Sequence, residues 1–208
     1  MQVRYIRVLS TFLGVSAFFG VSNLVAGTIG PTCNTCFGSI YTLNGYLESP
    51  PTTDETWVIS LSVDTSNYDG ADSDYIADVA LKLSNKVKSA SLLSAPTIAK
   101  WTLASVNTNI NSSGCSGSGN GWICAHDSAN GSAKADGSTY SWVFRVTMAA
   151  GSLLDLASIQ VNYDPPTGKL MSEKLNVPEG VVAELPLFLA GLGISLWSGN
   201  RWRRRKAA

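Results

Sequence analysis

The chain has 208 residues, and its fifteen basic side chains balance fifteen acidic ones. This neutrality comes from the two ends, because residues 27–176 hold seven lysines and one arginine against thirteen acidic residues, a net charge of −5. A mildly acidic segment without a stripe of basic residues argues against a nucleic-acid partner. Its length, about 150 residues, is typical of one domain with a sizeable core.

Residues 1–26 have the pattern of a secretory signal peptide. Arg4 and Arg7 form a positive N-terminal region, residues 8–25 are almost entirely apolar or small, and Ala26 and Gly27 offer small residues for cleavage. We therefore expect Sec-type export of the remainder. An uncleaved N-terminal anchor is the alternative, because the cleavage site is not ideal.

The four cysteines all lie in the segment that we expect to be exported. They are Cys33, Cys36, Cys115 and Cys124. An even number in an oxidising compartment favours disulfides, although three pairings are open. We expect the two local pairs, Cys33 with Cys36 and Cys115 with Cys124, because a Gly/Ser-rich loop gains most from closure. A redox pair is a weaker alternative, because Cys33 follows Pro31 in a turn-like entry and not at a strand-to-helix junction. A zinc site is also weaker, because eight residues separate the second pair and the compartment oxidises thiols.

Alternation of apolar and polar residues with a period of two predicts strands throughout residues 27–176. The clearest segments are 57–63, 79–83 and 140–148, and shorter ones lie at 39–47, 100–106, 122–126, 159–163 and 169–174. We expect turns at 67–74, 112–121, 129–137 and 164–168, and only 149–157 has a faint helical pattern. The fold class predicted is all-β, a single antiparallel β-sandwich or jelly roll. Its expected core contains Trp57, Leu61, Leu81, Trp142, Phe144 and Val146.

Acidic residues gather after the first of these clear strands, at Asp64, Asp69, Asp72 and Asp74. Oxygen ligands spaced around a glycine bend suit a hard cation, so this segment is a candidate calcium loop. It lacks the glutamate that closes an EF-hand loop at the twelfth position. The alternative is a solvated turn between two strands.

Catalytic residues are hard to find in this sequence. His126 is the single histidine, and we expect it to be a solvated loop residue, because no nucleophile and orienting acid accompany it. Six aromatic residues lie near strand ends or loops and could stack on sugar rings, although we expect most of them in the core. They are Tyr41, Tyr46, Tyr68, Tyr75, Trp101 and Trp122.

The C-terminal residues 177–208 form a three-part tail. It begins with Val177, Pro178, Glu179 and Gly180. Residues 181–199 follow, a mostly apolar segment that would be roughly 28 Å long as a helix, close to the thickness of the hydrocarbon core of a bilayer. The basic end contains Arg201, Arg203, Arg204, Arg205 and Lys206. These charges should hold the C-terminus on the cytoplasmic side of the membrane.

This tail resembles the PEP-CTERM sorting signal, in which a Pro-Glu-Pro motif, a hydrophobic segment and an Arg-rich end are recognised by an exosortase. Pro178 and Glu179 match the motif, whereas Gly180 stands where the family has its second proline. The resemblance implies an exosortase-like partner, transient anchoring in the inner membrane of a Gram-negative-type bacterium, and final delivery to the cell surface or medium. A plain single-span anchor is the alternative, since Glu184 near the outer end can lie at the interface.

Together these features predict a non-enzymatic exported surface or extracellular-matrix protein without a cofactor, calcium being the one candidate. Association with exopolysaccharide is implied by the family resemblance. The alternative is a secreted carbohydrate-active enzyme or a carbohydrate-binding module.

Overall fold

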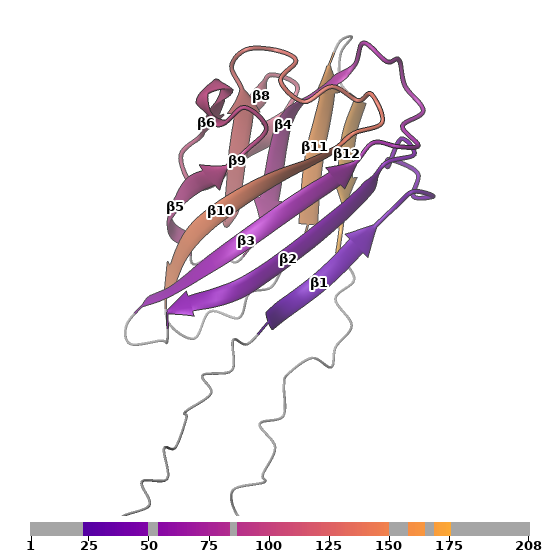
Figure 1. Ribbon diagram of the computed structural model, residues 1–208. Coiled ribbons are helices and arrows are strands. Elements are labelled where there is room, and N and C mark those ends of the chain that lie inside the picture. The colour runs from indigo at the N-terminus through magenta and orange to yellow at the C-terminus, as the bar shows by residue number, and fades with distance from the viewer. Residues whose placement is uncertain (1–22, 50–53, 84–86, 150–157, 165–168, 176–208) are drawn as a thin grey trace, which may run out of the picture.

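The computed structural model describes residues 23–49, 54–83, 87–149, 158–164 and 169–175 (Figure 1). Strands dominate these residues, and their only helical element is a 3-10 turn, Ile98–Lys100. The strands are β1 (Asn23–Ile29), β2 (Ile40–Ser49), β3 (Asp54–Asp64), β4 (Tyr75–Lys82), β5 (Val87–Ser94), β6 (Trp101–Leu103), β7 (Thr108–Asn111), β8 (Gly114–Ser118), β9 (Trp122–Asp127), β10 (Thr139–Ala149), β11 (Ser158–Asp164) and β12 (Lys169–Glu173). The all-β prediction is therefore confirmed.

Two five-stranded antiparallel sheets make up the architecture, which is sandwich-like. The first sheet has the order β1-β2-β3-β10-β5, and the second has the order β12-β11-β4-β9-β6. Figure 1 shows the first sheet as one layer and the second as another behind it. The remaining strands, β7 and β8, pair with each other as a hairpin.

The inward faces of both sheets supply one apolar core. Strands β3 and β10 pair over eleven residues in the middle of the first sheet, and their alternate side chains point inward. Trp142 and Phe144 are fully buried there, and the Trp142 ring meets the Trp101 ring edge to face, with 5.0 Å between centroids. The core expected from the sequence is confirmed, since its six members are all buried: Trp57, Leu61, Leu81, Trp142, Phe144 and Val146.

A second, smaller apolar cluster lies on the opposite face of the second sheet. Ala80, Trp122 and Cys124 are buried on this outer face although they alternate with core residues along β4 and β9. Ile110 of β7 completes the cluster. The hairpin β7–β8 therefore covers part of the outer face, and β4 is buried on both sides.

Four elements differ from the sequence-based prediction. β1, β5 and β7 were not expected, and residues 112–121, predicted as a turn-rich loop, contain the strand β8. β5 is an edge strand whose side chains are mostly exposed, so it has no clear apolar alternation. β8 consists of two glycines, two serines and Cys115. Glycine is depleted in strands, and contacts with the second sheet hold β8 in place.

Several predictions fall on residues outside the described ranges. These are the helical pattern at 150–157, most of the signal peptide, and the whole tail 177–208. Among the residues that the structure describes, no helix is long and apolar enough to cross a membrane. β1 begins at Asn23, so cleavage after residue 26 would leave Gly27–Ile29 as the part of this strand that pairs with β2.

Candidate functional site

A row of three polar side chains crosses the outer face of the second sheet. Asp78 of β4 lies directly opposite His126 of β9 on one side and Asn162 of β11 on the other. The Asp78 Oδ1 atom lies 2.8 Å from His126 Nδ1, and Asn162 Nδ2 donates to Asp78 Oδ2 at 3.0 Å. The sheet register alone brings these three residues together.

Asp78 is a buried carboxylate within the apolar run from Ile76 to Leu81 of β4. Its side chain is 2% exposed, whereas that of His126 is 45% exposed. Burying a carboxylate is costly unless donors satisfy it, and here each oxygen has one donor. Because a carboxylate only accepts, we assign the imidazole proton to Nδ1, which leaves His126 Nε2 as the ring nitrogen without a protein partner in the described structure.

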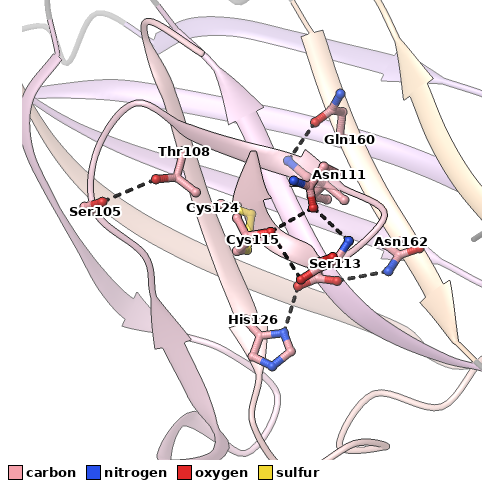
Figure 2. Close-up of a disulfide and its surroundings, with 12 residues drawn as sticks. Ser105, Thr108, Asn111, Ser113, Cys115, Cys124, His126, Gln160 and Asn162 are labelled. Carbon is pink, nitrogen blue, oxygen red and sulfur yellow. Dashed lines mark hydrogen bonds and ion pairs between the residues drawn. A yellow bond between two sulfur atoms is a disulfide. The ribbon is translucent and has the colours of Figure 1, made fainter. Parts of the chain in front are cut away.

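The hairpin β7–β8 is fastened to the neighbouring row of the same face. The disulfide Cys115–Cys124 joins β8 to β9, and the Ile110 backbone N–H donates to Gln160 Oε1 at 3.2 Å, as Figure 2 shows. Gly114 begins β8 directly above Asp78: it has φ 79°, and a Cβ atom there would lie 3.0 Å from Asp78 Oδ1. Glycine suits both the positive φ and the close approach.

A polar depression of about 500 Å³ opens where the hairpin ends and the row begins. Its walls come from the hairpin turn, from the row itself and from the ends of neighbouring strands. The lining residues are Ala77, Asp78, Asn111, Ser112, Ser113, Gly114, His126, Asn130, Asn162, Asp164 and Leu170. A smaller hollow of about 190 Å³ shares His126 and Ser113 with it and reaches the disulfide at Cys115. The volume of the larger depression is typical of small-ligand sites.

The turn that follows β9 is organised by one carboxylate. Asp127 is fully buried and accepts hydrogen bonds from the backbone N–H groups of Ala129, Gly131 and Ser132 and from the Ser132 hydroxyl. Burial raises the pKa of Asp127, but these donors outweigh it and hold the pKa below its usual value. The turn carries Asn130, so Asp127 positions one wall of the depression.

The expected disulfides are confirmed. Cys33 pairs with Cys36, and Cys115 pairs with Cys124. No free cysteine remains in the chain, because its four cysteines are all described. Only the second disulfide lies near the depression, where it fixes the hairpin wall.

The acidic segment does not form a cluster of ligands. Within the described ranges no three His, Cys, Asp or Glu side chains gather to hold a metal ion. Asp74 Oδ2 instead accepts from the Tyr68 hydroxyl at 2.7 Å and from the Ala71 N–H, and Lys169 Nζ lies 3.5 Å away. Asp64 accepts the Ser66 N–H, as in a solvated turn, and Asp69 and Asp72 are exposed.

His126 is not a solvated loop residue, so that expectation was wrong. It lies on β9, and its orienting acid, Asp78, is 48 positions away in sequence but adjacent in the sheet. Most of the six aromatic residues near strand ends or loops were expected in the core. The structure confirms this for three of them, because Tyr41, Trp101 and Trp122 are buried. Tyr46 is exposed, at 41%. Tyr68 stacks on the buried Tyr163 ring, with centroids 4.6 Å apart.

Sequence reasoning missed Asp78, Asn162 and Asp164. Asp78 could have been predicted as a site residue, because it interrupts the apolar run from Ile76 to Leu81. A charged side chain buried in such a run needs a hydrogen-bonding partner. Asn162 and Asp164 alternate with buried residues on β11 and look like ordinary solvent-facing positions. No protein-family model, curated protein or solved structure matches this chain significantly.

Replacing Cys115 and Cys124 with serine should lower the free energy of unfolding by about 2–3 kcal/mol, as the chain-entropy model gives for a loop of roughly ten residues. Urea denaturation of the double variant measures this loss. The matched control is the double serine variant of Cys33 and Cys36, which opens a shorter loop and should lose less. Equal stability of the Cys115/Cys124 variant and the parent protein would contradict the assigned role.

Asp127→Asn should destabilise the domain at pH 7 by about 1.5–3 kcal/mol, because hydrogen bonds to a charged acceptor are lost. Since the folded-state pKa of Asp127 is depressed, its contribution is complete above the unfolded-state value, about 3.9, and disappears as the pH falls through the folded value. The stability difference should therefore shrink below about pH 4. Chemical denaturation across pH tests this, with exposed Asp72→Asn as control, and a difference independent of pH would refute it.

Proposed function

We propose that this chain is a non-enzymatic, exported surface or extracellular-matrix protein of a Gram-negative-type bacterium. The observation that carries the proposal is the pair of disulfides in an all-β fold, because such bonds persist in oxidising compartments outside the cytosol. The sequence patterns at both ends support it. The proposed layout is a signal peptide at 1–26, a domain of sandwich or jelly-roll type at 27–176, and a sorting tail at 177–208.

The tail carries the sorting step of the proposal. An exosortase-like enzyme recognises the segment 177–180 while residues 181–199 sit in the inner membrane and the basic cluster 201–206 stays inside. The protein then reaches the surface or the medium. There the domain associates with exopolysaccharide, as the resemblance to PEP-CTERM proteins implies, and the polar depression offers side chains of the kind that bind hydroxyl groups.

A binding role fits the geometry around His126 better than a serine-hydrolase role. Ser113 lines the same depression, but no hydrogen bond joins its hydroxyl to His126 in the described structure. In Figure 2 the Nδ1 side of the ring faces the hairpin, and Nε2 points away from Ser113. A nucleophile needs its base within hydrogen-bonding distance.

One observation favours a second function, that of a secreted carbohydrate-active enzyme. Two carboxylates, Asp78 and Asp164, line one depression, and glycosidases use pairs of acids. Both Asp78 oxygens already accept hydrogen bonds, which favours binding. An enzyme would shorten a polysaccharide incubated with the purified domain, whereas a binding protein would leave the chain length unchanged.

The mature protein should lack residues 1 to about 26 and the basic tail, which intact-mass analysis of the surface and medium fractions measures. Replacing Arg203, Arg204 and Arg205 with glutamine should leave the tail unprocessed, because these charges hold it at the inner face. A matched control replaces the exposed residues Lys100, Lys134 and Lys174, which changes the charge equally. Mature surface protein that still contains peptides through Arg205 would overturn the tail assignment.

A further inference from the structure

We propose that the depression beside the row His126–Asp78–Asn162 binds a saccharide unit that carries a free amino group, such as a glucosamine residue of a polysaccharide. This inference rests on the proposed function and names the chemical class of its ligand. It goes beyond that function by fixing the site and by excluding acidic polysaccharides. Charge, spare hydrogen-bonding atoms and shape each support it.

The charge of the depression selects against anions. Asp78 and Asp164 line it, no lysine or arginine is among the lining residues described, and His126 is the one lining side chain that can become cationic. A uronic acid would bring a third carboxylate beside these two, whereas an ammonium group would be attracted. The acidic balance of residues 27–176 acts in the same direction at longer range.

Asp164 is the residue best placed to receive the ammonium group. Its Oδ2 atom accepts from the Tyr75 hydroxyl at 3.0 Å, and its Oδ1 atom has no partner in the described structure. Burial and the hydrogen bond to Asp164 raise the pKa of Tyr75 to about 12, so the phenol remains a donor at neutral pH. The bond from Tyr75 orients the carboxylate and leaves one oxygen for a ligand.

Spare amide and hydroxyl atoms surround this carboxylate. Asn162 uses its Nδ2 atom on Asp78 and keeps its carbonyl oxygen, whereas Asn111 uses its Oδ1 atom on Ser113 and Ser116 and keeps its amide nitrogen. The depression therefore presents an acceptor and a donor that are each oriented by a bond on the other side of the amide. A ligand rich in hydroxyl groups satisfies both, because a hydroxyl donates and accepts.

The shape of the depression suits a sugar ring. About 500 Å³ lies within the size range of small-ligand sites, and Ala77 and Leu170 give its lining an apolar part against which the C–H face of a ring can pack. The hairpin wall is fixed before any ligand arrives, since the Cys115–Cys124 disulfide and the Gln160 bond hold it to the sheet. A prearranged wall reduces the ordering cost of binding.

Isothermal titration calorimetry with three oligosaccharides tests the inference on the purified domain. The probes are a glucosamine oligomer, its N-acetylated form and a galacturonic acid oligomer of equal length. We expect the glucosamine oligomer to bind most tightly and Asp164→Asn to weaken its binding about tenfold to hundredfold, the loss expected for one charge-assisted hydrogen bond. Asp72→Asn, which removes the same charge from an exposed turn, should bind like the parent protein.

A second variant separates binding from folding. Ser112→Trp places a large side chain at the exposed rim and should abolish binding while the unfolding midpoint stays unchanged. No binding of the glucosamine oligomer, equal binding of all three probes, or unchanged affinity of Asp164→Asn overturns the inference. These outcomes are independent of export. If the protein is exported but does not bind the oligomers, only the proposed ligand is wrong. If it binds them but is not exported, the proposed function is wrong.

Discussion

The apolar layer between the two five-stranded sheets is the constraint on which the other features depend. Both sheets direct alternate side chains into it, and the inward positions of β10 from Trp142 to Met148 are all apolar. Polar groups are therefore placed on the outer faces or at the strand ends. On the second sheet the hairpin covers part of the outer face, and the depression lies where the hairpin turn meets the row of polar side chains.

Two kinds of interaction shape this outer face. Cross-strand pairing fixes the order of His126, Asp78 and Asn162, because register cannot change without turning the core residues of the same strands outward. The position of the hairpin is not fixed in this way, since its strands bury little apolar surface. The disulfide from Cys115 to Cys124 fixes it instead. The rigid row and the covalently held wall then meet at Gly114, where only glycine fits easily.

The parts of the fold that the sequence predicted are those where large apolar residues alternate. Residues 140–148 carry such a pattern and form β10, and the local cysteine spacing predicted both disulfides. β5 and β8 could not be found in this way, because an exposed edge strand and a Gly/Ser strand are stabilised by partners distant in sequence. The candidate site could not be predicted for the same reason. His126 has a hydrogen-bonding partner only because the sheet places Asp78 opposite it.

The tautomer of His126 is the most direct test of this row, because the Asp78 carboxylate accepts a hydrogen bond from the ring only if Nδ1 carries the proton. As the single histidine in the chain, it gives an unambiguous imidazole signal in ¹⁵N-detected or long-range ¹H–¹⁵N NMR spectra. We expect the neutral ring to carry its proton on Nδ1 and to leave Nε2 unprotonated. A neutral ring that carries its proton on Nε2 and leaves Nδ1 bare would contradict it, since Asp78 would then have lost its donor.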